Sequence, residues 1–264
     1  MTVIKATDKH MKNKELSTQQ ALRYSRQILL SGFDLDKQEQ LMNSSAIIIG
    51  MGGLGCAAAQ YLVAAGIGSI TIVDDDIVET TNLQRQILHF ESSVGTKKVD
   101  SAKHTLNQIN HYVDVKTIDQ RLNQTQLESL LLEHDIALDC CDNLETRNTL
   151  NDLCYSTKTP LVSGAAIRME GQIFCVLPEQ GSACYRCVSH FFGEQNLSCV
   201  ESGVMSPVVG IIGATQTNEA IKILTNYGTS PTNRLQLFDA MTSSWESFTV
   251  NPLANCPTCS DKKT

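Results

Sequence analysis

The hydrophobic residues of this chain fall into short apolar runs separated by longer segments with helical periodicity. Residues 46–49 form the first run, which ends at Gly50, and residues 69–73 form the second. Apolar runs of this length, bounded by turn residues, are typical of strands buried on both faces of a parallel sheet. The alanine-rich segment 54–65 between them predicts a helix, so the pattern indicates a strand–helix–strand unit.

The alternation of strands and helices continues as far as residue 160. Further helices are expected at 97–110, 126–134 and 145–156, and further strands at 113–118 and 136–139. Two more helices, at 22–30 and 36–42, are expected ahead of the first strand. This order predicts a doubly wound, Rossmann-like α/β fold with a mostly parallel sheet.

After Pro160 the pattern becomes richer in strands. Strands are expected at 161–163, 172–177, 235–238 and 245–250, with one long helix at 208–224. The second half is therefore expected to extend the sheet with antiparallel strands. Residues 181–207 show little periodicity, and a segment of that length in a compact domain is usually functional or mobile. We expect a flexible leader at 1–16 and one integrated domain at 17–264.

Composition excludes several classes of protein. The chain has 264 residues, is 42% hydrophobic and carries a net charge of −7, which disfavours bulk binding to nucleic acid or to an anionic membrane. It contains no apolar run of about 18 residues, so we expect no bilayer-spanning segment. The first twenty residues contain no apolar core of a signal peptide, and a cytoplasmic location is expected.

Two Cys-x-x-Cys pairs, Cys184/Cys187 and Cys256/Cys259, stand near the end of the chain. Two such pairs can close tetrahedrally on one Zn²⁺, and four thiolates leave no open position for catalysis. The spacing therefore predicts a structural zinc site, with unrelated reduced thiols or a disulfide pair as the alternative. Five further cysteines lie in apolar surroundings and are expected in the core: Cys56, Cys140, Cys141, Cys154 and Cys175.

A Gly-x-Gly-x-x-Gly turn, formed by Gly50, Gly52 and Gly55, lies between an expected strand and an expected helix. In this context glycines let the backbone approach phosphate, and the helix N-terminus offers unpaired N–H groups. The alternative is a tight turn without a ligand. Asp74 ends the next expected strand, where a carboxylate commonly accepts from ribose hydroxyls, so a ribose contact is expected, with a solvated strand-end turn as the alternative.

Charged residues downstream separate two kinds of nucleotide site. Arg85, Lys98 and Asp142 follow, and Asp142 lies just beyond an expected strand. An NAD site needs few cations, whereas an ATP site manages more charge through Arg and Lys side chains and Mg²⁺. A carboxylate such as Asp142 suits Mg²⁺ that bridges phosphates. The alternatives are a surface ion pair for Arg85, a solvated helix start for Lys98 and a helix N-cap for Asp142.

These motifs together resemble the MoeB/ThiF/HesA group, the bacterial relatives of ubiquitin-activating E1 enzymes. The resemblance rests on residues 23–27, the glycine turn, residues 74–86, residues 141–143 and both cysteine pairs, and it covers about residues 20–260. Residues 164–172 and 199–205 look most like the MoeB branch, whereas residues 237–239 and Trp245 lean toward the ThiF branch.

The resemblance implies ATP-dependent adenylylation of the C-terminal glycine of a ubiquitin-like sulfur carrier that ends in Gly-Gly. In the MoeB branch this carrier is the small subunit of molybdopterin synthase, in molybdenum cofactor biosynthesis; in the ThiF branch it is the thiamine-pathway carrier. The first is favoured. The resemblance also implies a homodimer in which Arg26 reaches the neighbouring subunit's site. It adds further residues to the nucleotide site: Gly53, Thr81, Asn82, Leu83, Gln84 and Asn143.

Cys199 allows two interpretations. It matches the position where some E1-like relatives carry a cysteine that bonds covalently with the carrier, so it is a candidate nucleophile or persulfide acceptor. The alternative is a loop cysteine without essential chemistry, which fits a branch that stops at the adenylate. Two rival functions remain for the whole chain: a nicotinamide-dependent oxidoreductase, which leaves Arg85, Lys98 and Asp142 without a role, and a nonenzymatic zinc-containing interaction module.

Overall fold

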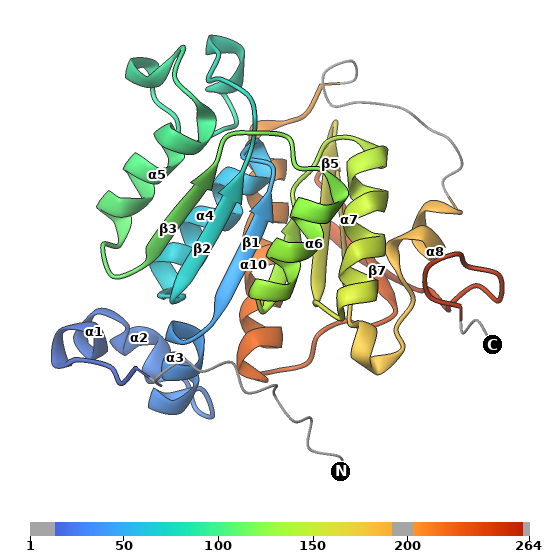
Figure 1. Ribbon diagram of the computed structural model, residues 1–264, viewed down its shortest axis with the longest axis horizontal. Helices are drawn as coiled ribbons and strands as arrows, with labels where there is room; N and C mark the ends of the chain where they lie inside the picture. Colours follow the sequence, from blue (N-terminus) through green and yellow to red (C-terminus); the bar gives the residue numbers. More distant parts are fainter. Residues whose placement is uncertain (1–13, 192–202, 261–264) are drawn as a thin grey trace.

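The computed structural model describes residues 14–191 and 203–260, and this part of the chain forms one eight-stranded sheet (Figure 1). The strand order is β3-β2-β1-β4-β5-β6-β7-β8. The strands are β1 Ser45–Ile49, β2 Ser69–Val73, β3 Asp114–Ile118, β4 Ile136–Asp139, β5 Leu161–Ile167, β6 Glu170–Val176, β7 Arg234–Asp239 and β8 Ser244–Thr249.

The first five strands are parallel, and the later ones continue the sheet in antiparallel pairs. All five residues of β1 are buried, because helices cover both faces of the sheet. Ile47 packs into the core on one face and Ile48 into the core on the other, as the two-residue repeat of a strand requires. The predicted doubly wound sheet with an antiparallel extension is confirmed.

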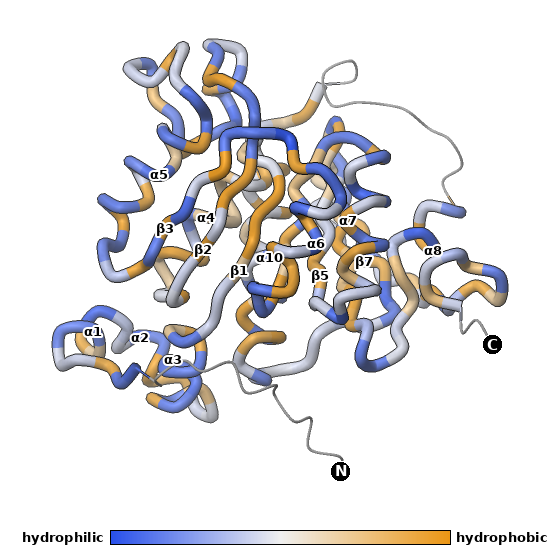
Figure 2. The backbone as a smooth tube through the Cα atoms, viewed as in Figure 1, coloured by the Kyte–Doolittle hydropathy of each residue, from blue (hydrophilic) through white to orange (hydrophobic). Residues whose placement is uncertain are grey.

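Helices lie on both faces of the sheet. In Figure 1, α6 (Gln124–Glu133) and α7 (Leu144–Thr157) lie in front of it, and α4 (Gly53–Ala65) and α10 (Ser206–Thr225) lie behind it. The hydropathy colours of Figure 2 show apolar residues along the central strand β1 and polar residues in many of the connecting loops. The other helices are α1 Thr18–Arg23, α2 Ser25–Ile28, α3 Asp34–Met42, α5 Lys98–Ile109 and α8 Tyr185–Ser189, with 3₁₀ turns η1 Thr80–Asn82, η2 Glu91–Ser93 and η3 Pro178–Gln180.

Two local expectations from the sequence are wrong, and one helix was not expected. The single helix expected at 22–30 is divided into α1 and α2 at Tyr24, whose ring is buried and whose hydroxyl accepts from Asn110 Nδ2 at 2.8 Å. Strand β5 continues four residues beyond 163, because it pairs with β6 along its whole length. The segment expected to lack periodicity also contains α8, which the sequence analysis missed.

Two expectations fall wholly or mostly outside the described residues: the flexible leader at 1–16, of which only residues 14–16 are described, and the segment around Cys199. Among the described helices, none combines the length and the apolar composition that a membrane crossing needs.

Candidate functional site

A cavity of about 850 Å³ opens at the carboxyl ends of β1, β2 and β4. It lies where the strand order reverses, since β2 and β4 pair with opposite edges of β1. Ligands of doubly wound sheets bind in this crevice. Its lining contains nine residues that the sequence analysis proposed for the nucleotide: Gly50, Gly52, Gly53, Asp74, Asn82, Arg85, Lys98, Asp142 and Asn143.

The glycine turn joins β1 to α4 at the wall of this cavity. A Cβ on Gly50, where φ is +96°, would lie 2.7 Å from Cys140 O, and one on Gly55 would lie 1.9 Å from Gly50 O. Both glycines are therefore required by close backbone contacts, and Gly55 is not part of the lining. Gly52 caps α4 without a side-chain hydrogen bond, so the first N–H groups of a 13-residue helix remain available to an anion.

Asp74 fastens the glycine turn from the neighbouring strand. Its Oδ2 accepts from Met51 N at 2.6 Å, and its Oδ1 accepts from Asp76 N at 2.9 Å. Each carboxylate oxygen has two lone pairs, so Asp74 can accept a ribose hydroxyl in addition. The ribose contact stays a prediction, and the simple solvated strand end is excluded by these two bonds.

Lys98 is buried at the start of α5, where only 6% of the residue is exposed. Its ammonium lies 2.7 Å from Asp76 Oδ2 and 3.9 Å from Asp74 Oδ1. A solvated helix start is therefore ruled out. The two carboxylates hold a positive charge against the cavity wall, beside the glycine turn.

Arg85 follows η1 and lines the cavity. Its guanidinium donates to a neutral acceptor, Thr81 O, at 3.1 Å. The described residues include no acidic partner within ion-pair distance of it, which removes the surface ion pair considered for this residue. Asn82 Oδ1 closes η1 by accepting from Glu79 N at 3.0 Å. Thr81, Leu83 and Gln84 shape the same turn but do not line the cavity.

Asp142 and Asn143 follow β4 at the opposite wall. Asn143 is the N-cap of α7, because its Oδ1 accepts from Thr146 N at 2.9 Å. The capping role considered for Asp142 therefore belongs to Asn143. Asp142 is exposed to the cavity, and its carboxylate is available to a ligand.

The lining includes residues that the sequence analysis missed. Arg121 lies in the loop that follows β3, at the same edge of the sheet, so the strand-end logic used for Asp142 would have found it. Gln86 is 3% exposed, and its buried Oε1 has no partner among the described residues. Nothing in the sequence distinguishes this glutamine from its neighbour Gln84.

His89 supports the glycine turn from behind. Its Nδ1 lies 2.9 Å from Ser101 Oγ, and its Nε2 lies 3.4 Å from Met51 O. Burial lowers the pKa of His89, so the imidazole is neutral at pH 7 and adds no charge beside Lys98. The ring therefore acts as a support for the turn.

One predicted catalytic residue lies away from the cavity, and another falls outside the described residues. Arg26 is in α2, outside the lining, and α2 lies beyond the amino end of β1 while the cavity lies at its carboxyl end (Figure 1). Arg26 therefore does not serve the site of its own chain. Cys199 lies outside the described residues.

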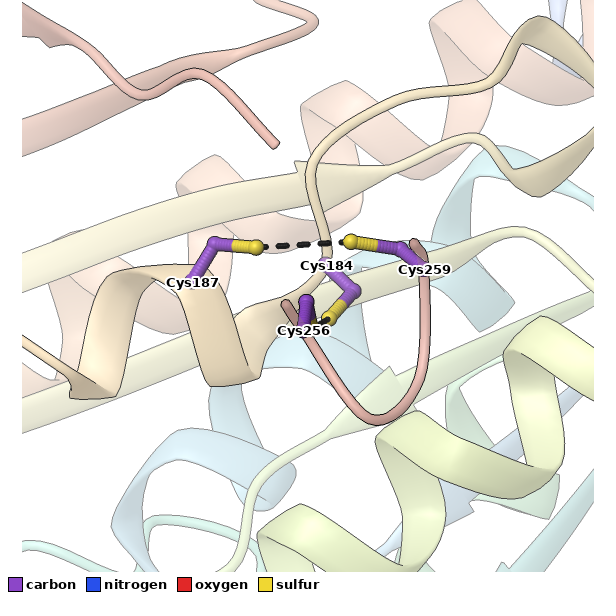
Figure 3. A group of neighbouring side chains, drawn as sticks. All are labelled: Cys184, Cys187, Cys256 and Cys259. Atoms are coloured by element: carbon purple, nitrogen blue, oxygen red, sulfur yellow. Dashed lines mark hydrogen bonds between the residues drawn. The ribbon is translucent and has the colours of Figure 1, made fainter. Parts of the chain in front are cut away.

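The four cysteines of the two Cys-x-x-Cys pairs converge into one cluster (Figure 3). Cys184 and Cys256 have their sulfurs 3.5 Å apart, and Cys187 and Cys259 have theirs 3.4 Å apart. A disulfide needs about 2.05 Å. Four sulfurs placed tetrahedrally around Zn²⁺ would be separated by about 3.8 Å, given a Zn–S distance of about 2.3 Å. The geometry therefore fits a metal site and excludes two disulfides.

The pKa values of the cysteines in this cluster are shifted in opposite directions. Burial raises the pKa of Cys184 to about 11. For Cys256 burial acts in the same direction, but the backbone N–H groups of Cys259 and Thr258 outweigh it and lower the pKa to about 7. Burial likewise raises the pKa of Cys259. None of the four lines the cavity, as expected of a structural site.

The five remaining cysteines expected in the core are buried. Burial raises the pKa of Cys56 to about 12, and the pKa values of Cys140, Cys141, Cys154 and Cys175 are raised by the same cause. These thiols are neutral at pH 7. The prediction that they act as small core residues is confirmed.

Residues 24–258 match the model of the ThiF family. The molybdopterin-synthase adenylyltransferase of Escherichia coli is 49% identical to this chain over 245 residues, which cover 93% of this chain and 98% of the relative. The sulfur carrier protein ThiS adenylyltransferase of E. coli is 40% identical over 238 residues, which cover 90% of this chain and 94% of the relative.

A solved structure shows the same fold. The crystal structure of E. coli MccB with ATP superposes with a TM-score of 0.78 at 25% sequence identity, covering 90% of this chain and 74% of that one.

Proposed function

The chain belongs to the ThiF family, and we propose that it adenylylates the C-terminal glycine of a ubiquitin-like sulfur carrier in molybdenum cofactor biosynthesis. Its homologues over nearly the whole length are adenylyltransferases, so the chain is an enzyme that transfers AMP from ATP. The molybdopterin-pathway relative is more similar to it than the thiamine-pathway relative, which supports the first carrier over the second. The nicotinamide-dependent alternative has no support from these relatives.

The observation that carries the proposal is the gathering of Arg85, Lys98 and Asp142 around one cavity beside the N-terminus of α4. The carrier's terminal carboxyl group, with an ordinary pKa of about 3.3–3.7, is ionised at pH 7 and needs no general base. A carboxylate oxygen attacks the α-phosphorus, and the bond to pyrophosphate breaks. The protein must bring two anions together and stabilise the charge on the departing pyrophosphate.

Each of the side chains around the cavity can help to position the two anions or to stabilise their charge. Lys98 and Arg85 offer positive charge to the phosphates, and Asp74 holds the glycine turn in place. Asp142 suits Mg²⁺, which neutralises phosphate charge when bound. Asn143 caps α7 and so keeps the turn that carries Asp142 in place. We propose Zn²⁺ on the four cysteines, in a reducing and therefore cytoplasmic location.

The test is carrier-dependent exchange of pyrophosphate into ATP. With the molybdopterin-pathway carrier ending in Gly-Gly, labelled pyrophosphate should enter ATP, and removal of the last glycine should abolish exchange because the nucleophile is displaced. Faster exchange with the thiamine-pathway carrier would reverse the choice of partner. No exchange with either carrier would contradict the proposal and leave a nonenzymatic module. Enhanced NADH fluorescence on mixing would support the oxidoreductase.

We also propose a homodimer in which Arg26 completes the partner's site. Arg26 lies on α2 between Leu22 and Leu29, which are 70% and 73% exposed. Leu22 belongs to α1 and Leu29 follows α2, and apolar side chains left this accessible close together along the chain favour association with another surface. An arginine among them would be carried to the neighbouring copy.

This arrangement predicts complementation between two inactive variants. Hybrid dimers of Arg26→Ala and Asp142→Asn contain one site with both residues intact, so a one-to-one mixture should recover about a quarter of wild-type exchange. The matched control mixes Lys98→Gln with Asp142→Asn, whose altered residues lie in the same cavity. That mixture should remain inactive. Equal activity of the two mixtures would exclude a site shared between subunits.

A further inference from the structure

A buried ion pair lies between the cavity and the cysteine cluster. Arg147 of α7 is 5% exposed, and its Nε lies 3.1 Å from Oδ2 of Asp139, the last residue of β4, which is fully buried. Ser163 Oγ donates to the same oxygen at 2.6 Å. Burial acts against the charge on Arg147, but Asp139 outweighs it and raises the pKa of the guanidinium. The guanidinium is therefore charged.

The pair fixes the residue that precedes Asp142. Asp139 Oδ1 accepts from Cys141 N at 3.0 Å, and Arg147 Nη2 donates to Cys141 O at 2.6 Å. Both polar groups of the Cys141 backbone are thus held, and Cys141 O belongs to the peptide group that leads into Asp142. Arg147 Nη2 also donates to Gly164 O at 2.9 Å, so the turn is anchored to β5 as well.

The guanidinium of Arg147 also contacts Tyr185, the residue that follows Cys184 of the cysteine cluster. Its Nη1 donates to the Tyr185 hydroxyl at 3.3 Å, and its Cζ lies 5.1 Å from the centre of the same ring. Tyr185 directly follows Cys184, and its backbone N–H donates to Asn151 Oδ1 at 2.7 Å. A single guanidinium therefore touches the residue beside a metal-site cysteine and the peptide group beside Asp142.

We propose that Arg147 is a positioning residue that ties the Asp142 turn to the tetracysteine cluster and thereby sets the affinity for Mg·ATP. This inference rests on the proposed function, since it gives Asp142 the metal-binding role. A buried ion pair contributes little net stability compared with apolar packing, so stability alone does not account for its presence. Apolar side chains could not make the directed hydrogen bonds that Arg147 donates to Cys141 O, Gly164 O and the Tyr185 hydroxyl.

The test compares the same substitution at two arginines. Arg147→Lys keeps a positive charge beside Asp139, but one ammonium cannot reach the three acceptors that the guanidinium joins. Arg186→Lys is the matched control, because Arg186 also links α8 to α7, through Asp152 at 2.5 Å and 2.7 Å, and lies outside the cavity lining. Binding of a non-hydrolysable ATP analogue is measured by calorimetry with and without Mg²⁺, alongside the metal content and melting temperature of each variant.

Arg147→Lys should raise the Kd for the analogue with Mg²⁺ by about 10–100-fold, the usual effect of losing a group that orients a metal ligand. Its Kd without Mg²⁺ and its zinc content should match those of Arg186→Lys. Equal Mg²⁺-dependent Kd values in the two variants would overturn the inference and leave the proposed function intact. Failure of the wild-type protein to bind the analogue with Mg²⁺ would instead contradict the proposed function.

Tyr185→Phe keeps the inference testable if Arg147→Lys does not fold, since it removes one hydroxyl and retains the ring. It should raise the Kd with Mg²⁺ in the same direction, by several-fold, with a full complement of zinc. An unchanged Kd in this variant would disprove the link to the cluster.

Discussion

Replacing Asp142 by asparagine is expected to lower carrier-dependent ATP–pyrophosphate exchange on the order of a thousandfold. The amide has nearly the size of the carboxylate but lacks the charge that Mg²⁺ requires. Asp142 is exposed to the cavity, and Asn143 rather than Asp142 caps α7. Replacing Asp142 by asparagine should therefore leave the fold unchanged. The measurement is initial exchange rate at saturating carrier, over a range of Mg²⁺ concentrations.

Glu145→Gln is the matched control for this prediction. Glu145 is an exposed carboxylate that also lines the cavity, in the first turn of α7. If negative charge in the cavity mattered in general, both variants would lose activity alike. A specific role for Asp142 requires that Glu145→Gln stay within a few-fold of wild type, and that the loss in Asp142→Asn persist at high Mg²⁺. Equal, nonzero rates for Asp142→Asn and wild type would refute the assignment.

Several of the residues that line the cavity could be predicted from the sequence because the carboxyl ends of parallel strands lie at the same edge of a sheet. The apolar run 46–49 ends at Gly50, and the run 136–139 ends just before the Cys140–Asn143 turn. Two strands that are paired in register deliver such residues to the same crevice, although about 90 positions separate them along the chain. The cysteine cluster was predictable for a similar reason, since spacing at i and i+3 leaves few other uses for four thiols.

The residues that organise the site could not be found in the same way. Arg147 stands in a segment with ordinary helical polarity, and a charged residue there is normally solvated. Its burial follows from the packing of α7 against both β4 and α8, which no local pattern encodes. Tyr24 likewise divides the first helix because it bonds to Asn110, a residue far along the chain.

The two metal sites that we propose differ in how many ligands the protein supplies. The cysteine cluster is closed and buried, so its chemistry is that of a structural clip. Asp142 offers one exposed carboxylate, and phosphates and water must complete the shell of any Mg²⁺. Because the protein would supply only one ligand to this Mg²⁺, the affinity depends on where that ligand lies. The hydrogen bonds of Asp139 and Arg147 to the Cys141 backbone hold it in position.

The largest effect on stability is expected from Cys184→Ser. Removing one of four thiolates should abolish tight zinc binding, and metal sites of this kind contribute on the order of 10 kcal/mol to folding. That is comparable with the whole stability of a typical domain, about 5–15 kcal/mol. We therefore expect little soluble protein, no bound zinc by elemental analysis and a lowered melting temperature in any fraction that folds.

Cys154→Ser separates loss of metal from loss of a buried thiol. Cys154 is fully buried in α7 and belongs to the same core cluster as Cys184, but it is not one of the four converging cysteines. Placing a hydroxyl in that core should cost about 1–3 kcal/mol and leave zinc bound. If Cys184→Ser melted no lower than Cys154→Ser while carrying no metal, the cluster would not be a folding element. In that case the hydrogen bonds of Tyr185 to Asn151, Arg147 and Gln172 would hold it without the metal, and the position of the Asp142 turn would not depend on the metal.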